Sequence, residues 1–264
     1  MRTGDGDVLR EWSMIWLFDC DGVLWRGDNL LPTACEALTV ARGAGVRCVF
    51  VSNFSHPTVA EYQAKLARLG ATVEAGDIIT SSHAAARLAG RNAKAFVCGG
   101  PGLSEALQLA GTAVVRAEDA DTVLAGRLPG SWDLANEAVD VLLRGARFIA
   151  TNDDPLYPTA SGHVLGTGAL VAALEVAGGQ KAEIAGKPHE PMVRLIKERF
   201  GTIDAVIGDR EATDGALARR LGARFAHIRS GFTKPDAEFM DATEVRATDV
   251  SAADVLTAVA ELLS

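Results

Sequence analysis

Short apolar runs alternate with segments of helical periodicity along nearly the whole chain, and this alternation restricts the fold more than any other feature. Five runs outside the middle of the chain predict strands, at residues 15–19, 46–51, 183–185, 205–207 and 223–228. Apolar residues recur every three or four positions after Pro57 and after Pro191, which predicts amphipathic helices that begin near these prolines. Strands that alternate with helices in this way form parallel sheets, so the sequence predicts an α/β fold.

A second alternating set of elements lies between residues 82 and 182. Strands are predicted at 95–98, 113–116, 122–125 and 147–151, and helices at 102–110, 132–143 and 168–176. This block carries few candidate catalytic groups, but it has enough hydrophobic periodicity for a core of its own. We therefore expect residues 1–81 and 183–264 to form one domain and residues 82–182 to form a smaller α/β domain inserted into it.

Composition and charge exclude several kinds of partner. The 264 residues are 48% hydrophobic and carry a formal net charge of −8, which argues against a nucleic-acid or anionic-membrane partner. No stretch of about 18 apolar residues is present, and residues 1–13 lack the apolar segment of a secretory signal. The four cysteines form no C-x-x-C pair, so we expect buried free thiols in a cytoplasmic protein.

The first predicted strand ends in two carboxylates, Asp19 and Asp21, followed at once by Gly22. Ligands of open α/β sheets bind just beyond the carboxyl ends of the strands. Two acids there can hold a hard cation, or one can attack a substrate while the other moves a proton. The alternative interpretation is a tight turn, for which Asp-Gly is also typical. Alternation along the strand points Cys20 away from both acids, which indicates a packing role.

Three further polar groups follow predicted strands outside the middle block. Ser52 and Asn53 precede a helix, where they suit a phosphate cradle or a helix N-cap. Lys187 lies between a glycine and a proline, where an ammonium group can neutralise a phosphoryl group or simply occupy an exposed turn. Asp209 and Asp214 flank the start of a helix, where acids complete a cation site or only complement the helix dipole.

Four motifs in order resemble those of the haloacid dehalogenase superfamily of aspartyl-phosphate phosphotransferases: DCDGVLW, FVSNFS, IAGKPHEP and GDREATD. The insert, with VCGGPGL, ATNDDPLYP and GTGALVAALEVAGG, is similar to the α/β cap of one subgroup. That subgroup, which includes 4-nitrophenyl phosphatases and phosphoglycolate phosphatases, carries its cap between the second and third motifs. The resemblance covers about residues 14 to 222, and it implies a Rossmann-like core with an inserted cap domain.

The resemblance also implies roles for the acids. Asp19 is expected to attack phosphorus, and Asp21 to protonate the leaving alcohol and later activate water. Mg²⁺ is expected to be held by a side-chain oxygen of Asp19, the backbone carbonyl of Asp21 and a side-chain oxygen of Asp209. Asp214 is expected to lie next to the metal ligands without binding the metal itself.

The remaining roles concern the substrate. Ser52 and Asn53 are expected to hydrogen-bond the phosphoryl oxygens, and Lys187 to offset charge on both the nucleophile and the phosphoryl group. In the cap loop 153–158, Leu156 and Tyr157 are expected to select the substrate. Arg210 is expected either to reach a substrate anion or to form a structural ion pair.

The function expected from these features is Mg²⁺-dependent hydrolysis of a small phosphate monoester, such as a sugar, polyol or small-acid phosphate, with 4-nitrophenyl phosphate as a test substrate. Two alternatives stay open: a phosphotransferase or mutase of the same superfamily, and a catalytically silent protein that binds a phosphorylated metabolite. A homodimer through the cap is also expected from the resemblance. A G-x-G-x-x-G motif after the first strand and a G-x-x-x-x-G-K-[ST] loop are both missing from the sequence, which disfavours dinucleotide and P-loop chemistry.

Overall fold

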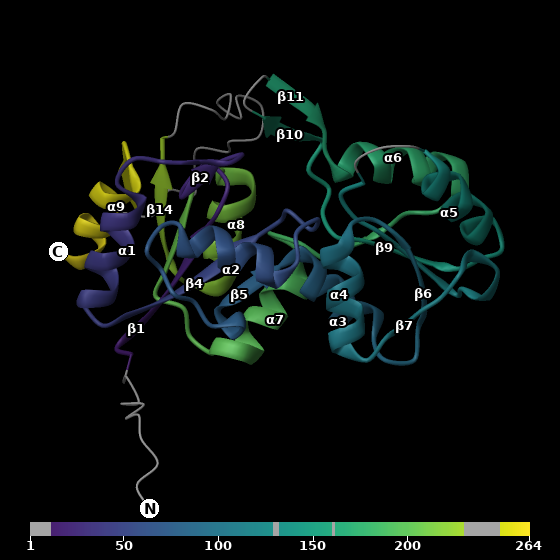
Figure 1. Cartoon of the computed structure of the whole chain (residues 1–264), viewed down its shortest axis with the longest axis horizontal. Coiled ribbons are helices and arrows are strands. Elements are labelled where there is room, and N and C mark those ends of the chain that lie inside the picture. The colour runs from purple at the N-terminus through teal and green to yellow at the C-terminus, as the bar shows by residue number, and fades with distance from the viewer. Residues whose placement is uncertain (1–11, 129–131, 160–161, 230–248) are drawn as a thin grey trace, which may run out of the picture.

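The computed structural model describes residues 12–128, 132–159, 162–229 and 249–264. It has two lobes, each built on a parallel sheet with helices (Figure 1). The core sheet has six strands, in the order β15 (Val250–Ala252), β14 (Arg224–Ile228), β13 (Ala205–Gly208), β1 (Met14–Asp19), β4 (Val46–Ser52) and β5 (Ile78–Thr80). All neighbouring strands in it are parallel, so the expected α/β fold is confirmed.

Alternation along β1 explains why helices cover both faces of the core sheet. Trp16 and Phe18 pack on one face and Leu17 on the other, because successive side chains of a strand point in opposite directions. The first face is covered by α1 (Ala34–Gly43), α2 (Val59–Ala67) and α9 (Val255–Leu263). The second is covered by α3 (Ser81–Ala89), α7 (Glu190–Phe200) and α8 (Ala216–Leu221).

The second lobe has its own parallel sheet. Its order is β12 (Glu183–Ile184), β9 (Arg147–Ala150), β8 (Thr122–Ala125), β6 (Lys94–Cys98) and β7 (Ala113–Val114). Helices α5 (Asp133–Leu143) and α6 (Thr167–Gly178) pack on one face. On the other face α4 (Pro101–Ala110) joins an apolar cluster that also contains core side chains. Because this cluster is continuous between the lobes, the domain boundaries at residues 82 and 182 stay a prediction.

One strand was assigned to the wrong sheet from the sequence. Residues 183–184 pair with β9 and extend the sheet of the second lobe, whereas we expected them to return the chain to the core sheet. A strand of two residues has no periodicity of its own, so its partner depends on the path of the returning chain. Strands β5 and β15 were not among the strands that we expected.

Two hairpins and three short turns of helix complete the fold. Strands β10 (Leu156–Thr159) and β11 (Gly162–Leu165) pair antiparallel and lie at the top of Figure 1, between the two lobes. Strands β2 (Trp25–Arg26) and β3 (Asn29–Leu30) form a smaller hairpin after β1. The short helical turns are η1 (Ala75–Asp77), η2 (Ala117–Asp119) and η3 (Glu211–Gly215). Hairpin β10–β11 includes the second half of the cap loop 153–158, with Leu156 and Tyr157, which are expected to select the substrate.

The carboxyl ends of the two sheets face each other. Beyond β4, the Ser55 hydroxyl accepts a hydrogen bond from the backbone N–H of Arg127, which follows β8, at 2.9 Å. The hydroxyl of Thr151, which follows β9, donates to the same oxygen at 3.2 Å. The ends at which open α/β sheets bind ligands therefore meet at one place between the lobes.

Two expectations from composition can be compared with the structure, the burial of the cysteines and the length of the apolar segments. Cys20, Cys48 and Cys98 are buried free thiols, but Cys35 is exposed, contrary to the expectation of burial. Within the ranges given above, no helix is both long enough and apolar enough to cross a bilayer. Most of the N-terminal segment that we examined for a signal sequence lies outside the described residues.

A close backbone contact joins the lobes at the start of α4. The N–H of Gly102 donates to the carbonyl of His56 at 2.8 Å, and a Cβ on Gly102 would lie 2.0 Å from the carbonyl oxygen of Pro57. We expect Gly102→Ala to lower the free energy of unfolding by about 1–3 kcal/mol, because the added Cβ would overlap the Pro57 carbonyl and force one of the two main chains to shift. Urea unfolding measures this change. Gly43→Ala, at a glycine with no atom within 4 Å, is the control and should not destabilise the protein.

Candidate active site

A cavity of about 360 Å³ lies where the carboxyl ends of the core strands meet the second lobe. Every residue predicted from the sequence to act at a site lines it: Asp19, Asp21, Ser52, Asn53, Leu156, Tyr157, Lys187, Asp209, Arg210 and Asp214. A larger hollow of about 650 Å³, between α2, α3, α4 and α7, contains none of them. The chemistry therefore belongs to the smaller cavity.

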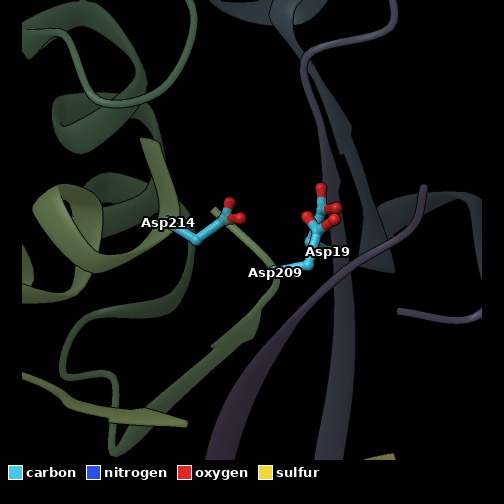
Figure 2. Close-up of side chains that lie close together, drawn as sticks. All are labelled: Asp19, Asp209 and Asp214. Carbon is cyan, nitrogen blue, oxygen red and sulfur yellow. The ribbon is translucent and has the colours of Figure 1, made fainter. Parts of the chain in front are cut away.

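Three buried carboxylates converge in this cavity (Figure 2). Asp19 ends β1, Asp209 follows β13 and Asp214 lies in η3, and one oxygen of each lies within 4.8 Å of the others. Gly22 permits this approach, because a Cβ at its position would lie 2.2 Å from Asp209 Oδ2. Its φ of +90° is also strained for other residues. Both the close approach of Asp209 and the backbone conformation therefore require glycine at this position.

Lys187 holds two of these carboxylates. Its Nζ donates to Asp19 Oδ1 at 2.5 Å and to Asp214 Oδ1 at 2.6 Å, and its side chain is 3% exposed. Burial by itself disfavours the ammonium form, but the carboxylates of Asp19 and Asp214 outweigh it and raise the pKa of Lys187. The amine therefore stays protonated and reduces the repulsion between the two acids.

The charge of the cluster suits a divalent cation. Burial raises the pKa of Asp209 to about 7, with Asp214 adding to the effect and Lys187 opposing it. Burial likewise raises the pKa of Asp19, which Lys187 opposes. Three carboxylates and one ammonium group carry two more negative than positive charges, and oxygen ligands at this spacing are those that Mg²⁺ and Ca²⁺ prefer. The donor set therefore fits the cation that the motifs imply.

Asp21 contacts a side chain from the second lobe. The hydroxyl of Tyr157, on hairpin β10–β11, donates to Asp21 Oδ1 at 3.2 Å. Burial raises the pKa of Asp21, and Lys65 and the hydrogen bond from Tyr157 oppose this shift. The ring of Phe54 stacks on Tyr157 at 4.5 Å between centroids. A carboxyl group with a raised pKa beside the cavity is a candidate for proton transfer.

The two residues that follow β4 are used differently. Ser52 Oγ accepts from the backbone N–H of Phe54 at 3.0 Å and borders the cavity. The amide of Asn53 exchanges two hydrogen bonds with the backbone of Lys187, at 2.8 and 3.1 Å, and donates to Asp154 at 3.0 Å. Asn53 therefore fixes the main chain that presents Lys187. The expected contact of its amide with a phosphoryl oxygen stays a prediction.

Asp154 is a site residue that sequence reasoning did not single out. Its Oδ1 accepts from the guanidinium of Arg210 at 2.5 Å, while its Oδ2 accepts from Asn53. Arg210 in turn donates its backbone N–H to Asp214 Oδ2 at 3.2 Å. Of the two roles left open for Arg210, the structure therefore shows the ion pair. One carboxylate of the second lobe thus connects two polar segments of the core.

Arg127 is the second residue that sequence reasoning missed. It follows β8 and lines the cavity, with its guanidinium carbon 5.9 Å from the centroid of the Tyr157 ring. The signal that identified Asp19 and Asp209, a polar residue at the carboxyl end of a parallel strand, also applies to Arg127.

Comparisons with known proteins agree with this fold and site. A family model described as haloacid dehalogenase-like hydrolase matches residues 16–113, and a HAD-hydrolase-like model matches residues 184–261. Glycerol-3-phosphate phosphatase from Homo sapiens is 34% identical over 246 residues, which cover 79% of this chain and 76% of that protein. The chain therefore belongs to the haloacid dehalogenase-like hydrolase family.

Two solved structures are similar over nearly the whole chain. The p-nitrophenyl phosphatase from Archaeoglobus fulgidus has a TM-score of 0.83 and 28% identity, and the match covers 94% of this chain and 99% of that one. A glycerol phosphate phosphatase from Mycobacterium tuberculosis, solved in complex with magnesium, has a TM-score of 0.79 and 28% identity, with 93% and 75% covered. Within the family, the expectation of a phosphoric monoester hydrolase with a Rossmann-like core and a cap is confirmed.

Loss of the Asp154 carboxylate tests the connection between the lobes. We expect Asp154→Asn to lower kcat/KM for 4-nitrophenyl phosphate about tenfold or more, because Arg210 loses its ion pair and Asn53 one acceptor. Steady-state kinetics measure the change. The control is Asp153→Asn at the adjacent carboxylate, whose described side-chain contact is a half-exposed pair with His189 at 3.0 Å. Equal losses in both variants would contradict the assignment.

Proposed function

We propose that this enzyme hydrolyses small phosphate monoesters with the help of Mg²⁺, through an aspartyl phosphate formed on Asp19. The observation that carries the proposal is the arrangement of Lys187 between Asp19 and Asp214, with Asp209 alongside, in the cavity that also holds Asp21. Phosphoryl transfer depends mainly on positioning and charge neutralisation, and this arrangement supplies both.

The cation would be held by side-chain oxygens of Asp19 and Asp209 and by the backbone carbonyl of Asp21. When bound, it would neutralise charge on the phosphoryl oxygens and allow an anionic nucleophile to approach an anionic substrate. Asp214 is then better described as the anchor of Lys187, because its two oxygens accept from the Lys187 ammonium and the Arg210 backbone. Its carboxylate would stabilise the metal site through Lys187, without binding the metal itself.

In the first displacement, Asp19 attacks phosphorus and the bond to the leaving oxygen breaks. Lys187 keeps the attacking carboxylate oriented, since it donates to the Oδ1 oxygen. Ser52 and backbone N–H groups beyond β4 bind phosphoryl oxygens. Asp21, in its protonated form, transfers a proton to the leaving alcohol.

In the second displacement, Asp21 acts as a base and Asp19 is the leaving group. Asp21, now ionised, removes a proton from a water molecule that attacks the phosphorus of the acyl phosphate. Inorganic phosphate leaves, and Asp19 is regenerated as a carboxylate. An acid that becomes a base needs a pKa near the working pH, and the burial that raises the pKa of Asp21 supports this role.

The size of the cavity supports small substrates. Hairpin β10–β11 covers it with Leu156 and Tyr157, which leaves about 360 Å³. A pocket of this volume suits a compact organic phosphate, whereas a phosphorylated protein or nucleic acid needs an open approach. The relatives named for glycerol phosphate and p-nitrophenyl phosphate support the same substrate class.

Association of two copies through the cap remains a proposal of the same kind. Two apolar side chains on the cap helices are strongly exposed, Leu143 on α5 at 65% and Val176 on α6 at 86%. Association of two copies through these helices would remove both side chains from water.

Substitution of the two acids tests the mechanism. We expect Asp19→Asn to lower turnover of 4-nitrophenyl phosphate roughly a thousandfold or more, because no acyl phosphate can form. Asp21→Asn should instead accumulate phosphoenzyme, since nitrophenolate leaves without a proton but water is no longer activated. Phosphate release and mass spectrometry of the intact protein measure the two effects. The control, Asp140→Asn on the exposed surface of α5, should behave as the wild type. Wild-type turnover in Asp19→Asn would refute the mechanism.

Thermal stability tests the cation site independently of activity. The pKa of Asp209 is raised from its ordinary 3.8 to about 7, so its protonated form stabilises the metal-free protein below about pH 4 and this contribution disappears as the pH rises through 7. Because the ligands bind Mg²⁺ only when deprotonated, the Tm increase on adding Mg²⁺ should be larger at pH 8 than at pH 5. Differential scanning fluorimetry measures the increase.

The matched variant for this experiment is Asp209→Asn. It should abolish the Mg²⁺-dependent increase in Tm at both pH values and remove one buried charge from the metal-free protein. A Tm increase that is the same in wild type and Asp209→Asn would show that Mg²⁺ binds elsewhere.

A further inference from the structure

The side chain of Arg127 borders the cavity from the cap, and the mechanism does not use it. We propose that Arg127 binds a carboxylate on the leaving group, so that the preferred substrates are phosphate monoesters of small hydroxy acids. This inference rests on the proposed function, because it identifies what one side of the same cavity recognises.

The location of Arg127 matches the leaving group rather than the phosphoryl group. Asp21, which would protonate the leaving oxygen, accepts from the hydroxyl of Tyr157, and the guanidinium of Arg127 lies near the same tyrosine ring. Lys187 and Asp19, which bond each other, mark the phosphoryl end. A small alcohol that leaves toward Asp21 therefore extends toward Tyr157 and Arg127.

The other cations of the cavity already have carboxylate partners or a carboxylate nearby. Lys187 bonds Asp19 and Asp214, Arg210 bonds Asp154, and Arg26 interacts electrostatically with Asp209. No carboxylate forms an ion pair with Arg127 in the part of the chain that the structure describes. A substrate carboxylate can therefore bind Arg127 without first displacing an acid of the protein, which would cost one charge-assisted bond for each one formed.

Hydrogen bonds fix the backbone at Arg127. The N–H of Arg127 donates to Ser55 Oγ, and the N–H of Gly126 donates to the carbonyl of Cys98 at 3.0 Å. A Cβ on Gly126 would lie 3.0 Å from Ser55 Oγ, so this segment packs closely against the core. The guanidinium is thus presented from a rigid strand end, as a specific carboxylate site requires.

A structural role is the competing explanation. Arg127 could serve only to hold the ring of Tyr157 through a cation–π contact. That contact does not depend on the substrate, so its loss would affect all substrates alike. Carboxylate binding, in contrast, affects only substrates that carry the carboxylate.

Two matched substrates separate these explanations. Glycerol 3-phosphate and 3-phosphoglycerate differ only in a hydroxymethyl group that is replaced by a carboxylate. The quantity to measure is the ratio of kcat/KM for 3-phosphoglycerate to that for glycerol 3-phosphate, in wild type, Arg127→Met, Arg127→Lys and Arg116→Met. Arg116 is a cap arginine with a side chain 85% exposed, so its variant controls for the change in net charge.

We expect the wild type to prefer 3-phosphoglycerate and Arg127→Met to lower the ratio about 10- to 100-fold, mainly through KM, because a charged hydrogen bond is lost. Arg127→Lys should retain part of the preference, and Arg116→Met should match the wild type. An unchanged ratio in Arg127→Met, an equal loss for both substrates, or a wild-type preference for glycerol 3-phosphate would overturn the inference. Turnover of 4-nitrophenyl phosphate by the wild type distinguishes failure of this inference from failure of the proposed function. If the wild type does not hydrolyse 4-nitrophenyl phosphate, the proposed function is rejected as well.

Discussion

The ammonium group of Lys187 is the interaction on which the rest of the site depends. It lies between the buried carboxylates of Asp19 and Asp214, which would otherwise repel each other in a region with little water. Buried ion pairs add little net stability, since removal of the charges from water offsets their attraction. What this pair supplies is geometry. It fixes the end of β1 against η3 and orients the Asp19 carboxylate in the cavity, while the Asn53 amide fixes the lysine backbone.

The second requirement is that the cap completes the cavity. The carboxyl ends of the two sheets face each other, so each lobe contributes polar groups from the place where its own sheet would bind a ligand. Asp154 joins Asn53 and Arg210, and Tyr157 reaches Asp21. Because these contacts cross between the lobes, separating the lobes would open the cavity to water and break the contacts of Asp154 and Tyr157 with the core.

Much of this was predictable because parallel strands align their carboxyl ends. Asp19 and Asp209 each follow an apolar run, and once those runs are strands of one sheet, the acids must lie at one edge. Where local pattern was weak, the prediction was wrong or missing: the two-residue strand at 183–184 joined the cap sheet, and hairpin β10–β11 was not expected. The role of Arg210 stayed open because no local pattern indicates that Asp154, 56 positions away in the chain, lies beside it.

The sequence by itself determined the α/β class, the order of the four polar motifs and the kind of chemistry that their charges allow, because these follow from periodicity and residue type. Only the tertiary structure decided which charges meet. The Asn53 amide bonds a residue 134 positions away in the chain, and Asp154 pairs with one 56 positions away. Such contacts depend on how two lobes pack and on which way each side chain then points, and neither property is encoded in a local pattern. For the same reason the place of Arg127 at the cavity, near the ring of Tyr157, became visible only in the folded protein.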